Sequence, residues 1–261
     1  MTADRAGPGS TVEPRIAGPG GTADGRGPSV VIPARFNGPP DSGHGGYTCG
    51  VLAGLARPGP GAAAAVTLLA PPALDRPLAL RIGIPRSTLW DGDELVATVT
   101  AAPPPTPVVD PVSVAVADAA AERFPGRTGH PFPTCFACGP EHPDGLRLAP
   151  GPVDASHRRV ACVWRPRWSG AQVPPELVWS ALDCPAGWVV DLRARPMVLT
   201  RMTADVRGSV RSGQSYVVVA RRTADHGRTA VNGACLYDDR GGLVAVATAV
   251  WTFVRAGGKD A

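Results

Sequence analysis

An order of elements that occurs twice along the chain most constrains its fold. In each half, a segment of helical composition precedes a run of segments that alternate between apolar and polar residues. The two helical segments are residues 47–57 and 174–190. The strand-like segments that follow them begin at residues 64, 78 and 95 in the first half and at residues 197, 214, 228 and 243 in the second. A repeated helix followed by antiparallel strands predicts an α+β fold with an internal duplication.

Glycine and proline mark where the two halves end. The chain has 32 Gly and 30 Pro among 261 residues, yet 44% of it is hydrophobic, which is too apolar for disorder throughout. These residues should therefore be concentrated outside the packed parts. We predict a disordered tail at 1–28, one unit at 29–103, a proline-rich linker with a helix at 104–129, a second unit at 130–255 and a short tail at 256–261.

Charge and hydropathy exclude several classes of protein. The net charge is +4, Lys259 is the single lysine, and no basic run carries interleaved aromatic residues, so nucleic acid is not an expected partner. The sequence shows neither a signal-peptide pattern nor an apolar stretch of membrane-spanning length. We therefore expect a cytoplasmic protein with no membrane partner, whose six cysteines are reduced thiols.

Residues 130–148, "HPFPTCFACGPEHPDGLRL", contain the densest group of functional side chains. Cys135 and Cys138 could be half of a tetrahedral zinc site, and His130 and His142 could complete it. The segment lacks the second paired motif of most such sites, and its Gly-Pro and Asp-Gly pairs suit a tight turn. We expect a structural turn before a strand at 146–149, with no metal or cofactor; a metal site and a redox dithiol are the alternatives.

The segment "CFACGPEHPDGLRL" resembles the Cys-Phe-x-Cys-Gly-x-x-x-Pro-x-Gly-Leu entry of hotdog-fold acyl-CoA thioesterases. Two further segments, "GPPDSGHGGYTCGVLAGLA" and "ELVWSALDCPAGW", resemble the central helix of that fold. The likeness covers residues 29–255. It implies a double hotdog: two antiparallel sheets, each wrapping a central helix, joined into one continuous sheet.

The resemblance also implies a site. In the family, a carboxylate on the central helix activates water, and a backbone amide at a helix N-terminus binds the oxyanion. The first helix keeps His44, Gly45 and Gly46 at its start but has Ala53 at the acid position, nine residues after His44. Asp183 occupies that position in the second helix.

The second helix has Pro174, Pro175 and Glu176 in place of His-Gly-Gly, so the two helices are complementary. One composite site with His44, Gly45, Gly46 and Asp183 is therefore expected, and the other pseudo-site should be inactive. Each residue also has a structural explanation: a buried acid serving local geometry, a turn histidine, and glycines that permit close packing.

Substrate contacts are predicted at four further residues of the second half. Trp179 and Trp188 could line an acyl pocket, and Arg221 and Arg222 could meet the phosphates of coenzyme A. Core packing and solvated strand positions are the alternative explanations.

Three functions follow for this sequence. The first is a hydrolase of acyl-CoA or a related thioester, in which Asp183 activates water. The second is a non-catalytic acyl or small-ligand binding module, and the third is a zinc-stabilised structural protein. Self-association as a homo-oligomer is left open by the sequence.

Overall fold

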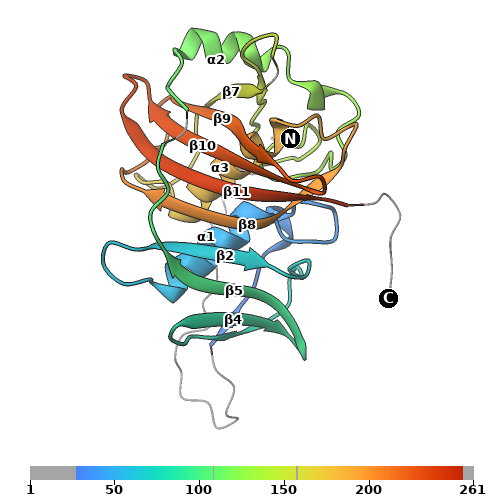
Figure 1. The fold of residues 1–261 in the computed structure, drawn as a ribbon, viewed down its shortest axis with the longest axis vertical. Helices are drawn as coiled ribbons and strands as arrows, with labels where there is room; N and C mark the ends of the chain where they lie inside the picture. The colour runs from blue at the N-terminus through green and yellow to red at the C-terminus, as the bar shows by residue number, and fades with distance from the viewer. Residues whose placement is uncertain (1–27, 108, 157, 255–261) are drawn as a thin grey trace, which may run out of the picture.

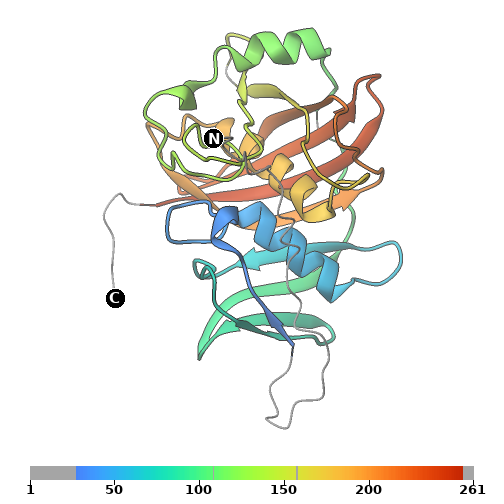
Figure 2. The same cartoon turned by 180° about the vertical axis from the view of Figure 1, so that it is seen from behind.

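The computed structural model describes residues 28–254, except 108 and 157. The predicted tails at 1–28 and 256–261 lie, apart from Pro28, outside the described residues. In the described part, the strands form one antiparallel sheet, and two long helices lie together against one of its faces (Figures 1 and 2).

The first half contributes the lower part of the sheet in Figure 1 and its central helix. Its elements are β1 (Ser29–Val30), the 3-10 helix η1 (Ala34–Phe36), α1 (Gly45–Ala56), β2 (Ala63–Leu68), β3 (Leu78–Arg81), β4 (Arg86–Asp91) and β5 (Glu94–Ala102).

The linker between the halves contains α2 (Val114–Ala121) and the 3-10 helix η2 (Pro125–Arg127). The elements of the second half are β6 (Gly151–Pro152), β7 (Arg159–Trp164), α3 (Pro175–Trp188), β8 (Met197–Val206), β9 (Tyr216–Asp225), β10 (Thr229–Asp238) and β11 (Leu243–Phe253).

The strand order shows the duplication. The sheet runs β1-β3-β4-β5-β2-β8-β11-β10-β9-β7-β6. In the first half, β2 follows the central helix, lies at the junction between the halves and pairs with the last strand, β5. In the second half, β8 has the same place and pairs with the last strand, β11. Strands β2 and β8 join the halves in antiparallel register, with Ala64 opposite Ala204 and Val66 opposite Met202. The predicted double hotdog with one continuous sheet is thus confirmed.

The two central helices pack against each other because α1 carries glycines where α3 approaches. A Cβ atom at Gly50 would lie 2.6 Å from the Cα atom of Glu176, and one at Gly46 would lie 2.8 Å from the Trp179 carbonyl oxygen. Such distances leave no room for a side chain, so the spacing of Gly46 and Gly50 fixes how closely the helices lie.

Helix α2 covers part of the opposite face, at the end of the sheet formed by β9, β7 and β6. Ala117 and Ala120 pack there against outward-facing residues of the second half, including Val217, Val219 and Cys235. Within the described residues, no helix is long and apolar enough to cross a membrane.

The structure departs from the sequence pattern at three short segments. The β-branched run from Ser29 to Phe36 predicts a strand, but β1 is only two residues long, because Pro33 leads into η1. Strand β4 was missed; Gly92, with φ of +60°, makes the β4–β5 turn. The strand expected at 146–149 is wrong, since Arg147 has φ of +56° and the N–H groups of Leu146 and Leu148 bind the carbonyls of the 130–148 segment.

Candidate active site

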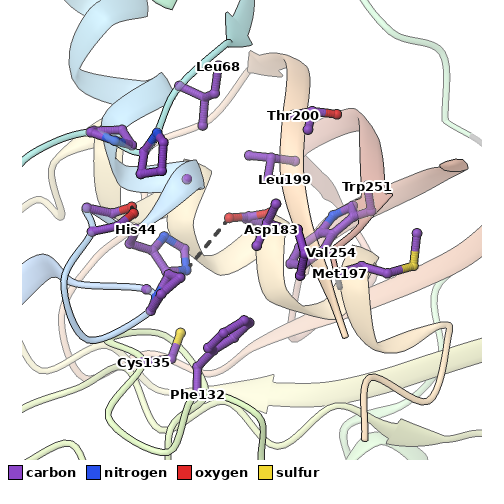
Figure 3. Close-up of a pocket in the computed structure, with 18 of the residues that line it drawn as sticks. His44, Leu68, Phe132, Cys135, Asp183, Met197, Leu199, Thr200, Trp251 and Val254 are labelled. Atoms are coloured by element: carbon purple, nitrogen blue, oxygen red, sulfur yellow. Dashed lines mark hydrogen bonds and ion pairs between the residues drawn. The ribbon is translucent and has the colours of Figure 1, made fainter. Parts of the chain in front are cut away.

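A cavity of about 520 Å³ lies where the start of α1, the middle of α3, strand β8 and residues 130–148, here called the entry loop, come together (Figure 3). Polar groups gather at one end of it, around His44 and Asp183. The rest of its wall is largely apolar, with contributions from Leu68, Phe132, Met197, Leu199, Trp251 and Val254. A concave apolar cavity with few polar groups at one end is the usual form of a small-molecule site.

Asp183 is the acid at this end. Its side chain is 2% exposed, and its Oδ2 atom accepts a hydrogen bond of 2.7 Å from the Gly46 N–H. Its Oδ1 atom is buried and has no hydrogen-bond partner among the described residues. Burial raises the pKa of Asp183 to about 6, against the opposing effects of His44 and of the Gly46 N–H. The carboxyl can therefore change protonation near neutral pH.

His44 caps α1 and faces the same carboxylate. Its Nδ1 atom accepts the Tyr47 N–H at 3.2 Å, so the neutral ring carries its proton on Nε2. Nε2 lies 3.2 Å from Cys184 Sγ and 3.7 Å from Asp183 Oδ2. Burial acts to lower the pKa of His44, yet the pKa is raised because Cys135 and Asp183 together outweigh that effect.

Gly45 is the first residue of α1 and lines the cavity. The first N–H groups of a helix have no partner within the helix. No acceptor for the Gly45 N–H is found in the described part of the chain. Gly46 differs, because its N–H is already bound to Asp183 and the residue does not line the cavity. The structure thus brings together His44, Gly45, Gly46 and Asp183, but gives the two glycines different surroundings.

Three thiols adjoin this end of the cavity, and their convergence is not apparent from the sequence. Cys135 and Cys138 come from the entry loop, and Cys184 follows Asp183 on α3. Hydrogen bonds from Cys138 and Cys184, and then the nearby His44, hold the pKa of Cys135 well below its ordinary value despite burial. One sequence feature indicates the cluster: Cys184 directly follows the predicted acid, Asp183, on the helix that comes after the entry loop.

The four predicted substrate-contact residues lie elsewhere. Trp188 packs against Phe124 and donates its indole N–H to Cys138, and neither it nor Trp179 lines the large cavity. Arg221 and Arg222 lie on β9 and also do not line it. Their contact with a coenzyme remains a prediction.

A second cavity of about 450 Å³ lies near the other ends of the two helices. Ala53 and Trp179 line it, as do Pro175 and Glu176 at the start of α3. This position corresponds to the expected second pseudo-site. It has no acid at residue 53, and Pro175 has no N–H to offer a ligand.

No protein-family model matches the sequence, and no curated protein matches it. Solved structures do match, and they show that the chain has the hotdog fold. A conserved hotdog protein of unknown function from Alicyclobacillus acidocaldarius is 18% identical, with a TM-score of 0.58 over 90% of this chain and 96% of that one.

Two mycobacterial structures match over a similar length. The acyl-CoA thioesterase II TesB2 of Mycobacterium marinum is 13% identical, with a TM-score of 0.53 over 88% of this chain and 93% of that one. The tesB protein of Mycobacterium avium subsp. paratuberculosis is 12% identical, with a TM-score of 0.54 over 84% and 90% of the two chains.

Proposed function

We propose that the chain hydrolyses acyl-CoA thioesters at one composite site built from both halves. The observation that carries the proposal is Asp183. It is a buried carboxylate with a pKa of about 6, fixed through one oxygen by Gly46, and its other oxygen has no partner among the described residues. Such a group suits a general base, whose pKa should lie near the working pH.

Asp183 would accept a proton from a water molecule in the cavity that its side chain lines. The resulting hydroxide attacks the carbonyl carbon of the thioester, the carbon–sulfur bond breaks, and the proton leaves with the thiol of coenzyme A. Because the Gly46 N–H binds Oδ2, the carboxylate keeps its orientation and Oδ1 is not used for that contact. Gly46 is then a positioning residue, not the oxyanion donor that the resemblance implied.

The Gly45 N–H would bind the oxyanion. It stands at the N-terminus of a 12-residue helix and borders the cavity near Asp183. Helix N-termini attract negative charge through their free N–H groups and the helix dipole. Preorganised donors of this kind are worth on the order of 10²–10³ in rate.

The apolar wall would hold the acyl chain. Leu68, Met197 and Leu199 come from the two strands at the junction, and Trp251 comes from β11. The name of one match, the acyl-CoA thioesterase II TesB2 of Mycobacterium marinum, supports acyl-CoA as the substrate class.

A panel of coenzyme A thioesters tests the proposal. Acyl groups from acetyl to long-chain and aromatic are incubated with the purified protein, and released thiol is measured. Binding of the same compounds is followed in parallel by calorimetry. Turnover of at least one thioester supports the hydrolase. Binding without turnover would replace it with the non-catalytic module, and neither binding nor turnover would overturn both.

A further inference from the structure

Three thiols and one imidazole converge beside Asp183 from three separate segments. Cys135 Sγ lies 3.7 Å from Cys184 Sγ and 3.8 Å from Cys138 Sγ. The His44 Nε2 atom lies 3.2 Å from Cys184 Sγ. The ligand atoms of His44, Cys135 and Cys184 all lie within 4.8 Å of one another, and these three residues are buried. All the cysteines involved are free thiols.

We infer that Cys135, Cys138, Cys184 and His44 form a structural zinc site. Three cysteines and one histidine are one of the usual ligand sets of closed, four-coordinate zinc sites. Zinc–sulfur bonds of about 2.3 Å at tetrahedral angles place the sulfur atoms about 3.8 Å apart, and a sulfur and a nitrogen about 3.5 Å apart. The sulfur–sulfur distances from Cys135 to Cys184 and to Cys138 match this spacing, and the nitrogen–sulfur distance is within a few tenths of an ångström of it. Cys138 adjoins the group of His44, Cys135 and Cys184 through Cys135, and its side chain would turn towards the other two ligands as the metal binds.

The surroundings of Cys138 fit a metal-bound thiolate. The Trp188 indole N–H, which can only donate, lies 3.4 Å from its sulfur. His130 accepts the Phe132 N–H at Nδ1, so its Nε2 carries a proton and donates it towards the same sulfur at 3.3 Å. Donors that point at a coordinating sulfur are the usual second shell of thiolate sites.

Coordination by His44 requires the lone pair on Nε2. The ring proton then moves to Nδ1, where it would face the Tyr47 N–H, so the hydrogen bond is lost and the imidazole has to turn away from that donor as the metal binds. The remaining thiol protons are released to solvent as zinc binds, as at other thiolate sites. All four side chains line the large cavity, which provides the entry path that a metal ion needs.

The site would join parts that are far apart in the chain. His44 belongs to the first half, Cys184 to the central helix of the second, and the entry loop lies between them. The sequence predicts a metal-free turn because the entry loop lacks a second pair of ligands. Cys184 and His44 would supply that pair. His142, the histidine weighed with the entry loop, takes no part, because its Nε2 donates to the Arg35 carbonyl at 2.8 Å.

Zinc content under reducing conditions tests the inference without reference to hydrolysis. Tag-free protein is loaded with zinc chloride, passed through a desalting column and measured by mass spectrometry of the metal. The wild type should retain about one zinc per chain. The double variant Cys135→Ala/Cys184→Ala should lose it, whereas Cys235→Ala, which removes a buried thiol on the opposite face of the sheet, should keep it.

Alkylation of the wild type tests the same ligands if the double variant fails to fold. Peptide mapping should show that zinc slows modification of Cys135, Cys138 and Cys184 at least tenfold, while the rates at Cys162 and Cys235 stay unchanged. A wild type that retains no zinc, zinc retained by a folded double variant, or equal alkylation with and without zinc would overturn the site.

Discussion

Gly46 donates its backbone N–H to Asp183 Oδ2 over 2.7 Å, and this bond joins the two central helices across 137 positions of sequence. A Cβ atom at Gly46 would lie 2.6 Å from Asp183 Cβ, so only glycine lets the two residues come so close. The same contact packs the helices and orients the carboxylate. The packing of the two helices and the orientation of the candidate acid therefore share this contact.

The close approach of the helices can be tested away from the site, at Gly50. Gly50→Ala would place a Cβ atom 2.6 Å from the Glu176 backbone, and overpacking of this kind costs about 1–3 kcal/mol of unfolding free energy. Gly54→Ala is the matched control on the same helix, since nothing lies within 4 Å of its added Cβ. It should stabilise the protein by about 0.5–1 kcal/mol. Urea unfolding measures both, and equal effects of the two substitutions would contradict the packing.

Asn232 should hold the last turn of α3 in place. The residue is fully buried, and its Nδ2 atom donates to the Ala186 carbonyl at 2.7 Å, just after Pro185, which lies inside the helix. Asn232→Ala leaves the buried Ala186 carbonyl without this hydrogen-bond donor. We expect a loss of about 1–3 kcal/mol in thermal or urea unfolding. A stability equal to that of the wild type would show that the carbonyl finds another partner.

The apolar wall should set the acyl length that the cavity accepts. Leu68 lies at this wall, and Leu68→Trp would fill part of the cavity (Figure 3). We expect kcat/KM for the longest accepted acyl-CoA to fall about tenfold or more, because each excluded methylene is worth about 1–3 kcal/mol. The shortest substrate serves as the internal control and should change little. A uniform loss across all lengths would place the acyl chain elsewhere.

Much of the fold could be predicted because long apolar and β-branched segments mark the long strands. Strands β8 to β11 span ten or eleven residues each; β8 alternates between buried and more exposed positions, whereas β9 to β11 contain runs of consecutive buried residues. The helices carry boundary signals such as Pro175. The wrong strand predictions concern short segments, in which the local backbone conformation determines the structure. Arg147, in the left-handed region, turns the entry loop away from the sheet, and nothing in the apolar pattern of residues 146–149 reveals that.

The candidate site was predicted in part for a different reason. Each helix lacks what the other keeps, and this complementarity predicts that Gly45 and Gly46 lie close to Asp183. The thiol cluster could not be predicted in this way. His44 and Cys184 are 140 positions apart, and their 3.2 Å contact depends on the packing of α1 on α3 and on the path of the entry loop.

Hydrolysis by Asp183→Asn tests the central claim most directly. The asparagine keeps the size of the side chain, and its oxygen can still accept the Gly46 N–H, so only the proton acceptor is lost. Released thiol and melting temperature are measured on the same preparations of wild type and variant. The account predicts that turnover falls by on the order of 10²–10⁴ while the variant stays folded at the assay temperature. Equal turnover in the two proteins, or a loss no larger than the fraction unfolded, would contradict it.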